Sequence, residues 1–179
     1  VQIQNEIGKL FKKYNVVEYK SPDDGMSIDD FCKTLGYAYL YKGMAEKVNG
    51  ILLEEVTVSL FRYVKPEKLL KELAWYGWRI REHSSGIYYI EGPGIPVQIV
   101  VMKELPSKEH PSLKILTRNV RETDIRNYVD YVNCFTEPGD RQNADAVLHV
   151  SISANRDEYA KARRDSSMEA LRELFKDEL

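Results

Sequence analysis

The regular exchange of strand-like and helix-like segments up to about Leu105 is the feature that most constrains the fold. Residues 54–64 are rich in β-branched and aromatic side chains, which predicts a strand. Residues 95–102 form a nearly continuous apolar run, which predicts a strand buried on both faces. Pro66 opens a helical segment, and residues 78–90 predict a hairpin around a Ser-Ser-Gly turn. This alternation indicates an α/β domain.

The segment that starts at Ser27 predicts the first helix, over residues 28–42. Ser27 is followed three positions later by Asp30, a spacing typical of a capping box at a helix start. Apolar side chains then recur at helical spacing, which predicts a face that packs onto the first strand. That face comprises Ile28, Phe31, Cys32, Leu35 and Tyr39, while Tyr37 and Tyr41 lie off it.

The pattern becomes purely helical beyond Pro106. Four segments there show a period of 3.6 residues, namely 112–120, 124–135, 142–154 and a last one that carries Met168, Leu171, Leu174 and Phe175. We therefore expect an α/β core over residues 1–106 and a helical C-terminal extension over residues 107–179.

Composition excludes several classes of protein. The 179 residues carry a net charge of −2, which argues against a protein that coats nucleic acid non-specifically. No apolar run approaches the roughly 20 residues that cross a bilayer, so we expect a cytoplasmic protein without a membrane partner. Cys32 and Cys134 lie far apart within apolar helical patterns, and we expect both to be small core residues. The chain begins at Val1 within an apolar–polar alternation, so we expect a segment upstream of it.

Most familiar catalytic motifs are missing from the sequence. Gly92-Pro93-Gly94 lacks the Lys-Ser/Thr of a phosphate-binding loop, and no serine stands in a nucleophile elbow. The three histidines, His83, His110 and His149, show no metal-ligand spacing. We expect His83 in a turn and His149 in a helix, both with ordinary structural surroundings.

Glu18 and Lys20 are the best candidates for chemistry. Residues 1–20 predict extended chain that leads into a strand stopped by Ser21-Pro22, and side chains two apart on a strand share a face. The two charges therefore either line a cleft or neutralise each other. A carboxylate beside an amine suits a hydrolase that uses a divalent metal, because Mg²⁺ prefers oxygen ligands and an ammonium can orient the attacking water. Alone, Glu-x-Lys is common and more often forms an ordinary ion pair.

A longer stretch around this pair resembles a known family. Residues 16–20 (VVEYK), followed by a turn and a helix, resemble the third motif of the PD-(D/E)XK nuclease superfamily. Closer still, four segments are similar to bacterial proteins related to its transposase-associated nucleases: residues 7–24 (IGKLFKKYNVVEYKSPDD), 27–31 (SIDDF), 36–38 (GYA) and 168–179 (MEALRELFKDEL).

The resemblance implies a restriction-endonuclease-like fold, with a mixed central sheet flanked by helices. It implies that Glu18 is a ligand of Mg²⁺ or Mn²⁺, that Lys20 is the water-orienting amine and that DNA is the substrate. The family also uses an Asp at the start of the preceding strand and a Glu from its first helix, and neither has a match in this sequence. Either these acids lie upstream of Val1 or the protein has lost them.

Further polar residues are weaker candidates. Asp23 and Asp24 suit a turn better than a metal. Two basic groups could line a nucleic-acid backbone, or simply be solvated: Lys9, Lys12 and Lys13, and Arg118, Arg121 and Arg126. Lys33 and Tyr37, four apart on one helix face, could likewise contact a phosphate.

A second hypothesis is a non-catalytic interaction protein built on a nuclease-derived scaffold. In it Glu18 and Lys20 form a structural pair, and some of the twelve tyrosines serve an interface. The sequence leaves the oligomeric state open.

Overall fold

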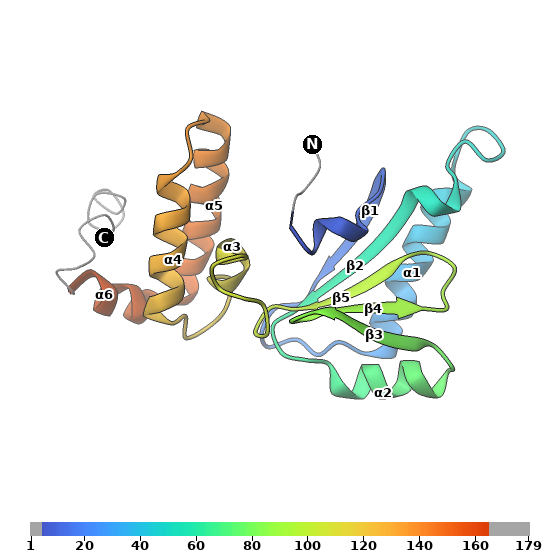
Figure 1. The fold of residues 1–179 in the computed structure, drawn as a ribbon, viewed down its shortest axis with the longest axis horizontal. Coiled ribbons are helices and arrows are strands. Elements are labelled where there is room, and N and C mark those ends of the chain that lie inside the picture. The colour runs from blue at the N-terminus through green and yellow to red at the C-terminus, as the bar shows by residue number, and fades with distance from the viewer. Residues whose placement is uncertain (1–4, 165–179) are drawn as a thin grey trace. The chain divides into compact units, whose positions relative to one another are not determined.

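The structure, a computed structural model, describes residues 5–164 and divides the chain into two compact units (Figure 1). Unit 1 is Val1–Leu105 and unit 2 is Pro106–Leu179. Each unit has a hydrophobic core of its own, so each is described by itself.

Unit 1 contains a five-stranded mixed sheet with the strand order β1-β2-β5-β4-β3. Strands β1, β2 and β5 run parallel, whereas β4 runs antiparallel to both β5 and β3. The α/β class with a mixed sheet flanked by helices is therefore confirmed. The strands are β1 (Tyr14–Tyr19), β2 (Val56–Arg62), β3 (Arg79–Ser84), β4 (Ile87–Glu91) and β5 (Val97–Val101).

The apolar runs of the sequence account for the centre of this sheet. All five residues of β5 are buried, as the continuous apolar run predicted, and so is every residue of β2 except Arg62. A 3₁₀ turn, η2 (Leu53–Glu55), precedes β2, so that strand begins two residues later than expected. The predicted hairpin is confirmed as β3 and β4.

Two helices, α1 (Ile28–Gly43) and α2 (Glu67–Trp75), cover one face of the sheet. Side chains of α1 and α2 share a single core cluster with the strands, including Phe31, Leu69, Val58 and Ile99. The predicted capping box is confirmed, because the Ser27 hydroxyl accepts from the Asp30 amide and the Asp30 carboxylate accepts from the Ser27 amide.

The face of α1 that is buried differs from the face that we expected. Cys32 is exposed, and Tyr39 is 43% exposed with its hydroxyl donating to the Pro93 carbonyl. Thr34 is fully buried in their place, because its hydroxyl donates to the Asp30 carbonyl at 2.8 Å and so leaves no polar atom unpaired. The prediction that Cys32 is a core residue was wrong, since one residue beyond Phe31 lies about 100° around the helix.

The opposite face of the sheet carries the start of the described chain, which is not extended as predicted but forms a 3₁₀ turn, η1 (Gly8–Leu10). Ile7 is buried there, and the Gln98 amide donates to its carbonyl at 3.0 Å and to the Ser59 hydroxyl at 2.9 Å. His83 lies in β3 rather than in a turn, and its ring stacks on Tyr89 with a centroid distance of 4.4 Å.

Unit 2 is helical in the part that the structure describes. Its core gathers around the buried rings of Tyr128 and Tyr159. The predicted segment 112–120 is helical only at its start, and α6 was not predicted. Cys134 is exposed just after α4, which corrects the expectation that it is a core residue. The helices are α3 (Pro111–Lys114), α4 (Glu122–Asn133), α5 (Pro138–Ala154) and α6 (Arg156–Arg164).

The helix predicted around residues 168–175 lies outside the described residues. Among residues 5–164, no helix combines the length and the apolar character needed to cross a membrane.

Two glycines of unit 1 provide a matched test of this fold. Gly86 adopts a φ of +77° in the β3–β4 turn, and a Cβ there would lie 2.7 Å from the Val101 carbonyl oxygen. Gly36 lies within α1, where a Cβ meets nothing within 4 Å. We expect Gly86→Ala to lower the free energy of unfolding by at least about 2 kcal/mol and Gly36→Ala to raise it by about 0.5 to 1 kcal/mol.

The measurement is urea unfolding followed by tryptophan fluorescence, which reports on unit 1 because Trp75 and Trp78, the two tryptophans of the sequence, belong to it. A stable Gly86→Ala variant would contradict the conformation of this turn.

Candidate functional site

Glu18 and Lys20 lie at the carboxyl end of β1, on the face of the sheet that α1 covers. The burial of β1 alternates, and Tyr14 and Val16 of the same face pack against the core. Val17 and Tyr19 point to the other face and are 53% and 46% exposed. The shared face of Glu18 and Lys20 thus follows from the pleat of the strand.

The Lys20 ammonium lies between two carboxylates. Its Nζ is 2.8 Å from Asp30 Oδ1 and 3.4 Å from Glu18 Oε1. The three side chains are between 17% and 25% exposed, so water reaches each of them only partly. Asp30 is the member that sequence reasoning assigned only to the helix cap. Its contact with Lys20 arises because α1 returns over β1 and brings its first turn to the end of the strand.

Asp30 uses both of its carboxylate oxygens. Oδ1 accepts from Lys20, and Oδ2 accepts from the Ser27 amide at 2.9 Å and the Ser27 hydroxyl at 2.7 Å. The hydrogen bond from Lys20, followed by those from Ser27, holds the pKa of Asp30 well below its ordinary value of 3.8. The same bond raises the pKa of Lys20 above 10.5. Lys20 is therefore an ammonium at neutral pH, able to donate to an anion but unable to accept a proton.

A cavity of about 490 Å³ adjoins this cluster at the carboxyl end of the parallel strands. Asp30 is the member of the cluster that lines it, together with the first turns of α1 and α2. Arg62, at the end of β2, also lines it and donates from Nε to the Asp24 carbonyl at 3.2 Å. Sites in α/β sheets commonly form at this end of the strands. The charged lining is mixed, with Asp29, Asp30, Glu67 and Glu72 against Arg62 and Lys68.

The described residues do not form a metal site by themselves. Within residues 5–164, no three His, Cys, Asp or Glu side chains lie together as a group that could hold an ion. The Lys20 ammonium already lies between Glu18 and Asp30 Oδ1, and Asp30 Oδ2 accepts from Ser27 in the helix cap. A Mg²⁺ ion at Glu18 would therefore need another oxygen ligand.

The weaker candidates are scattered over unit 1. Lys33 comes nearest to the cluster, with Nζ 3.8 Å from Asp30 Oδ1, and Tyr37 is 53% exposed on the same helix. Lys9 pairs with Glu6 at 2.6 Å, beside η1 on the other face of the sheet. Lys13 pairs with Glu55 at 3.6 Å.

The remaining candidates have local roles or lie in unit 2. Lys12 is exposed. The Asp24 carboxylate accepts from the Ser21 hydroxyl at 2.8 Å, as the predicted turn requires. In unit 2, Arg121 bonds to Asp124 and Arg126 bonds to Glu122, each at 2.8 Å.

The pKa of Asp30 leads to a prediction about acid stability. A carboxyl whose pKa is lower in the folded chain adds stability above its unfolded pKa, near 4, and this contribution is lost as the pH falls through the folded value. We expect Asp30→Asn to be less stable at pH 7 by about 1 to 2 kcal/mol and to lose less stability than the wild type between about pH 5 and pH 3.

The measurement is urea unfolding by tryptophan fluorescence across this pH range. Asp29→Asn, in the same turn, is the matched control, and identical pH profiles for the two variants would rule out the special role of Asp30.

Comparison with known proteins does not assign a function to this site. No protein-family model, no curated protein and no solved structure matches the chain. The case for a function therefore depends on the contacts that Glu18, Lys20 and Asp30 make.

Proposed function

We propose that unit 1 contributes Glu18 and Lys20 to a metal-dependent phosphodiesterase site of the PD-(D/E)XK type that acts on DNA. One observation carries this proposal. A carboxylate and a charged amine lie 3.4 Å apart on one face at the carboxyl end of a strand, and the helix that follows packs on that face. The proposal also draws on the sequence resemblance over residues 7–24.

Lys20 has a defined part in such a site. A phosphodiester is an anion, and an ammonium beside it neutralises charge and donates a hydrogen bond to a phosphate oxygen or to the attacking water. Because the pKa of Lys20 is raised, this side chain does not remove the proton of that water. Lys20 is therefore a positioning and charge-stabilising group in this proposal.

The proposal requires a second carboxylate, and the open edge of β1 is where one can enter. Within the described chain β1 pairs with β2 alone, so its outer backbone groups are available to another strand. Side chains on a strand paired there would lie about 4.5 to 5.5 Å from those of β1 on the same face. An acidic residue on that strand would thus stand beside Glu18.

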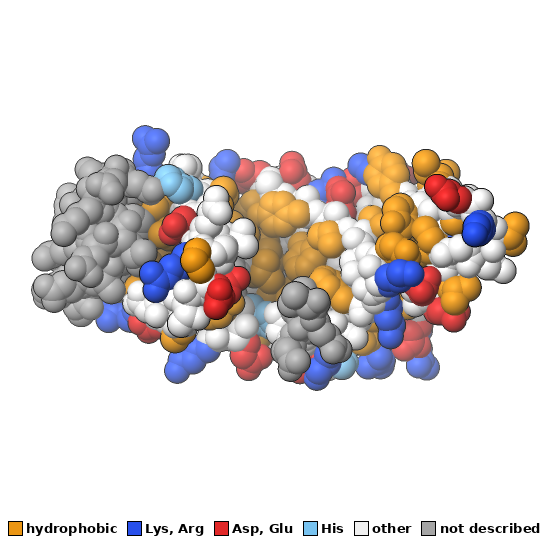
Figure 2. All heavy atoms as spheres, turned by 90° about the horizontal axis from the view of Figure 1, so that it is seen from above, with side chains coloured by type: hydrophobic (Ala, Val, Ile, Leu, Met, Phe, Trp, Pro, Cys, Tyr) orange, Lys and Arg blue, Asp and Glu red, His pale blue; other side chains and the backbone are white. Residues whose placement is uncertain are grey.

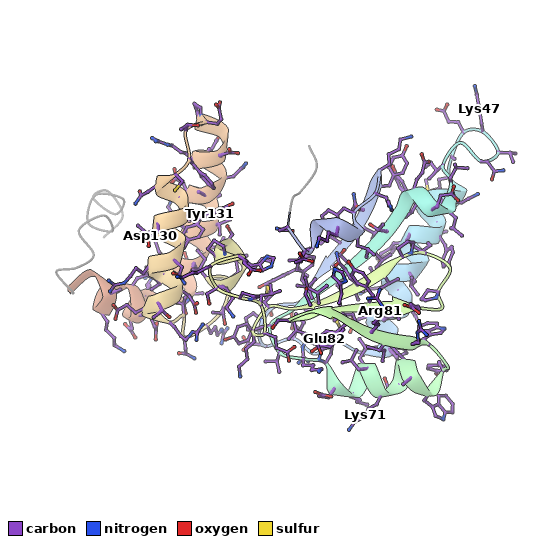
Figure 3. The ribbon with its side chains drawn as sticks, in the orientation of Figure 1. Lys47, Lys71, Arg81, Glu82, Asp130 and Tyr131 are labelled. Atoms are coloured by element: carbon purple, nitrogen blue, oxygen red, sulfur yellow. The ribbon has the colours of Figure 1, made fainter. Side chains whose placement is uncertain are left out.

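A second candidate is the non-catalytic interaction protein. It is favoured by the engagement of Lys20 with Asp30 at 2.8 Å, which is the geometry of a structural ion pair. Three apolar side chains at the end of α1 and in the loop after it, Leu40, Met44 and Val48, are 63%, 80% and 96% exposed. Figure 2 shows hydrophobic side chains gathered at the end of unit 1 that carries this loop, and Figure 3 labels Lys47 on it. Such clusters mark interaction surfaces.

The deciding experiment is DNA cleavage by the natural full-length protein, with single-stranded and double-stranded substrates and with Mg²⁺ or Mn²⁺. We expect Glu18→Gln and Lys20→Met each to lower the cleavage rate by at least about 100-fold. The first removes the carboxylate that would hold the metal, and the second removes the ammonium that would orient the water and neutralise the phosphate. Lys71→Met, an exposed lysine on α2 that Figure 3 labels, is the control with unchanged activity.

Urea unfolding of each variant separates lost chemistry from lost folding. Cleavage that survives Glu18→Gln would refute the nuclease proposal. A wild-type protein that neither binds Mn²⁺ nor cleaves DNA would favour the interaction protein.

A further inference from the structure

Unit 2 contains an aromatic pocket that the proposed nuclease site does not use. It is a cavity of about 200 Å³ between α3, α4 and α5. Three aromatic side chains of α4 and its C-terminal end line it, Tyr128, Tyr131 and Phe135, and α5 contributes Asp140 and Asn143. Tyr131 is 43% exposed, and Asp140 and Asn143 are exposed, so solvent reaches the pocket.

The rings are held in a fixed arrangement. Tyr131 and Phe135 are four residues apart, which places them on one side of the helix. Their ring centroids are 4.7 Å apart and their planes meet at 74°, so they form adjoining walls. The Tyr128 hydroxyl donates to the Ala144 carbonyl at 2.7 Å, which fixes this ring against α5. In Figure 3, Tyr131 and its neighbour Asp130 project from different sides of α4.

The charge of the residues that line the pocket favours a cation over an anion. Among the described residues that line it, Asp140 is the one with a carboxylate side chain. Aromatic faces attract cations through the ring quadrupole. Arg141 is adjacent in sequence, but its Nε donates to the Phe135 carbonyl at 3.0 Å, which holds it on the backbone. An anion would find no basic side chain in the lining.

We propose that this pocket binds a trimethylammonium group. A metal ion needs several oxygen ligands, and the lining holds one carboxylate, Asp140. Ser112 and Asn143 add neutral oxygen acceptors, while the aromatic rings, Ala144 and Val147 make up the rest of the lining and suit a cation that carries methyl groups. A trimethylammonium group is cationic, has no N–H to satisfy and packs its methyl groups against rings, which is the chemistry of an aromatic cage. Asp140 supplies the balancing negative charge. Two sources share this chemistry, a small molecule such as choline and a trimethylated lysine on a peptide.

The test is a titration of the full chain with choline, followed by NMR of the aromatic side chains. We expect choline to bind at least about tenfold more tightly than 3,3-dimethylbutan-1-ol, which has the same shape without the charge. Tyr131→Leu and Asp140→Asn should each weaken choline binding about fivefold or more, whereas Tyr131→Phe should retain it. Tyr76→Leu, which removes an exposed ring of unit 1, is the control with unchanged affinity.

Three outcomes would overturn the proposal: equal binding of the neutral alcohol, unchanged affinity in both Tyr131→Leu and Asp140→Asn, or no binding of either choline or a trimethyllysine peptide up to about 10 mM. Circular dichroism of each variant shows whether the helices remain intact. A second arm compares peptides with trimethylated and unmodified lysine. Tighter binding of the methylated peptide than of choline assigns the source to a peptide, and the reverse assigns it to a small molecule.

Discussion

The ion pair between Lys20 and Asp30 is the contact on which the candidate site depends. One oxygen of Asp30 receives the ammonium at the end of β1, and the other receives the Ser27 amide and hydroxyl at the start of α1. A single carboxylate thus ties the end of the strand to the start of the helix. In this position the Lys20 ammonium also lies 3.4 Å from Glu18 Oε1. The contact therefore has a structural role that does not depend on any chemistry at the site.

The structural role of Lys20 is compatible with a catalytic role. An ammonium has three N–H donors, and the two neighbouring carboxylates engage two of them. The third can donate to a water or a phosphate oxygen without release of Asp30. The raised pKa of Lys20 keeps all three donors in place at neutral pH, at the cost of any role as a base. Both the nuclease hypothesis and the scaffold hypothesis therefore have Lys20 as an ammonium. They differ in whether a second carboxylate lies beside Glu18.

The features that the sequence predicted are those with a local signal. The hairpin, the capping box of α1 and the burial of β5 each follow from spacings within a few residues. The misses need information from elsewhere in the fold. Thr34 replaces Cys32 in the core because a backbone carbonyl satisfies its hydroxyl. The helix α6 was not predicted because its sequence is mostly polar. Tyr159 and Ala162 are the α6 residues that belong to the core of unit 2. Asp30 joins the site through the return of α1 over β1. The helical spacing predicted that packing, but it did not predict that the first turn of α1 would bring Asp30 within 2.8 Å of Lys20.

The two edges of the sheet differ in a way that bears on this site. The edge strand β3 carries Arg79 and Arg81, both paired with Glu91, and Arg81 also lies over the ring of Tyr89. Charges of this kind discourage another strand from pairing. Figure 3 shows Arg81 and Glu82 on this strand. The outward face of β1 instead presents Asn15, Val17 and Tyr19, which are uncharged and exposed. At the end of β1 the charged side chains, Glu18 and Lys20, lie on the face that α1 covers. In the proposed nuclease site, a strand added at β1 would lie beside Glu18 and would be the one to supply the second carboxylate.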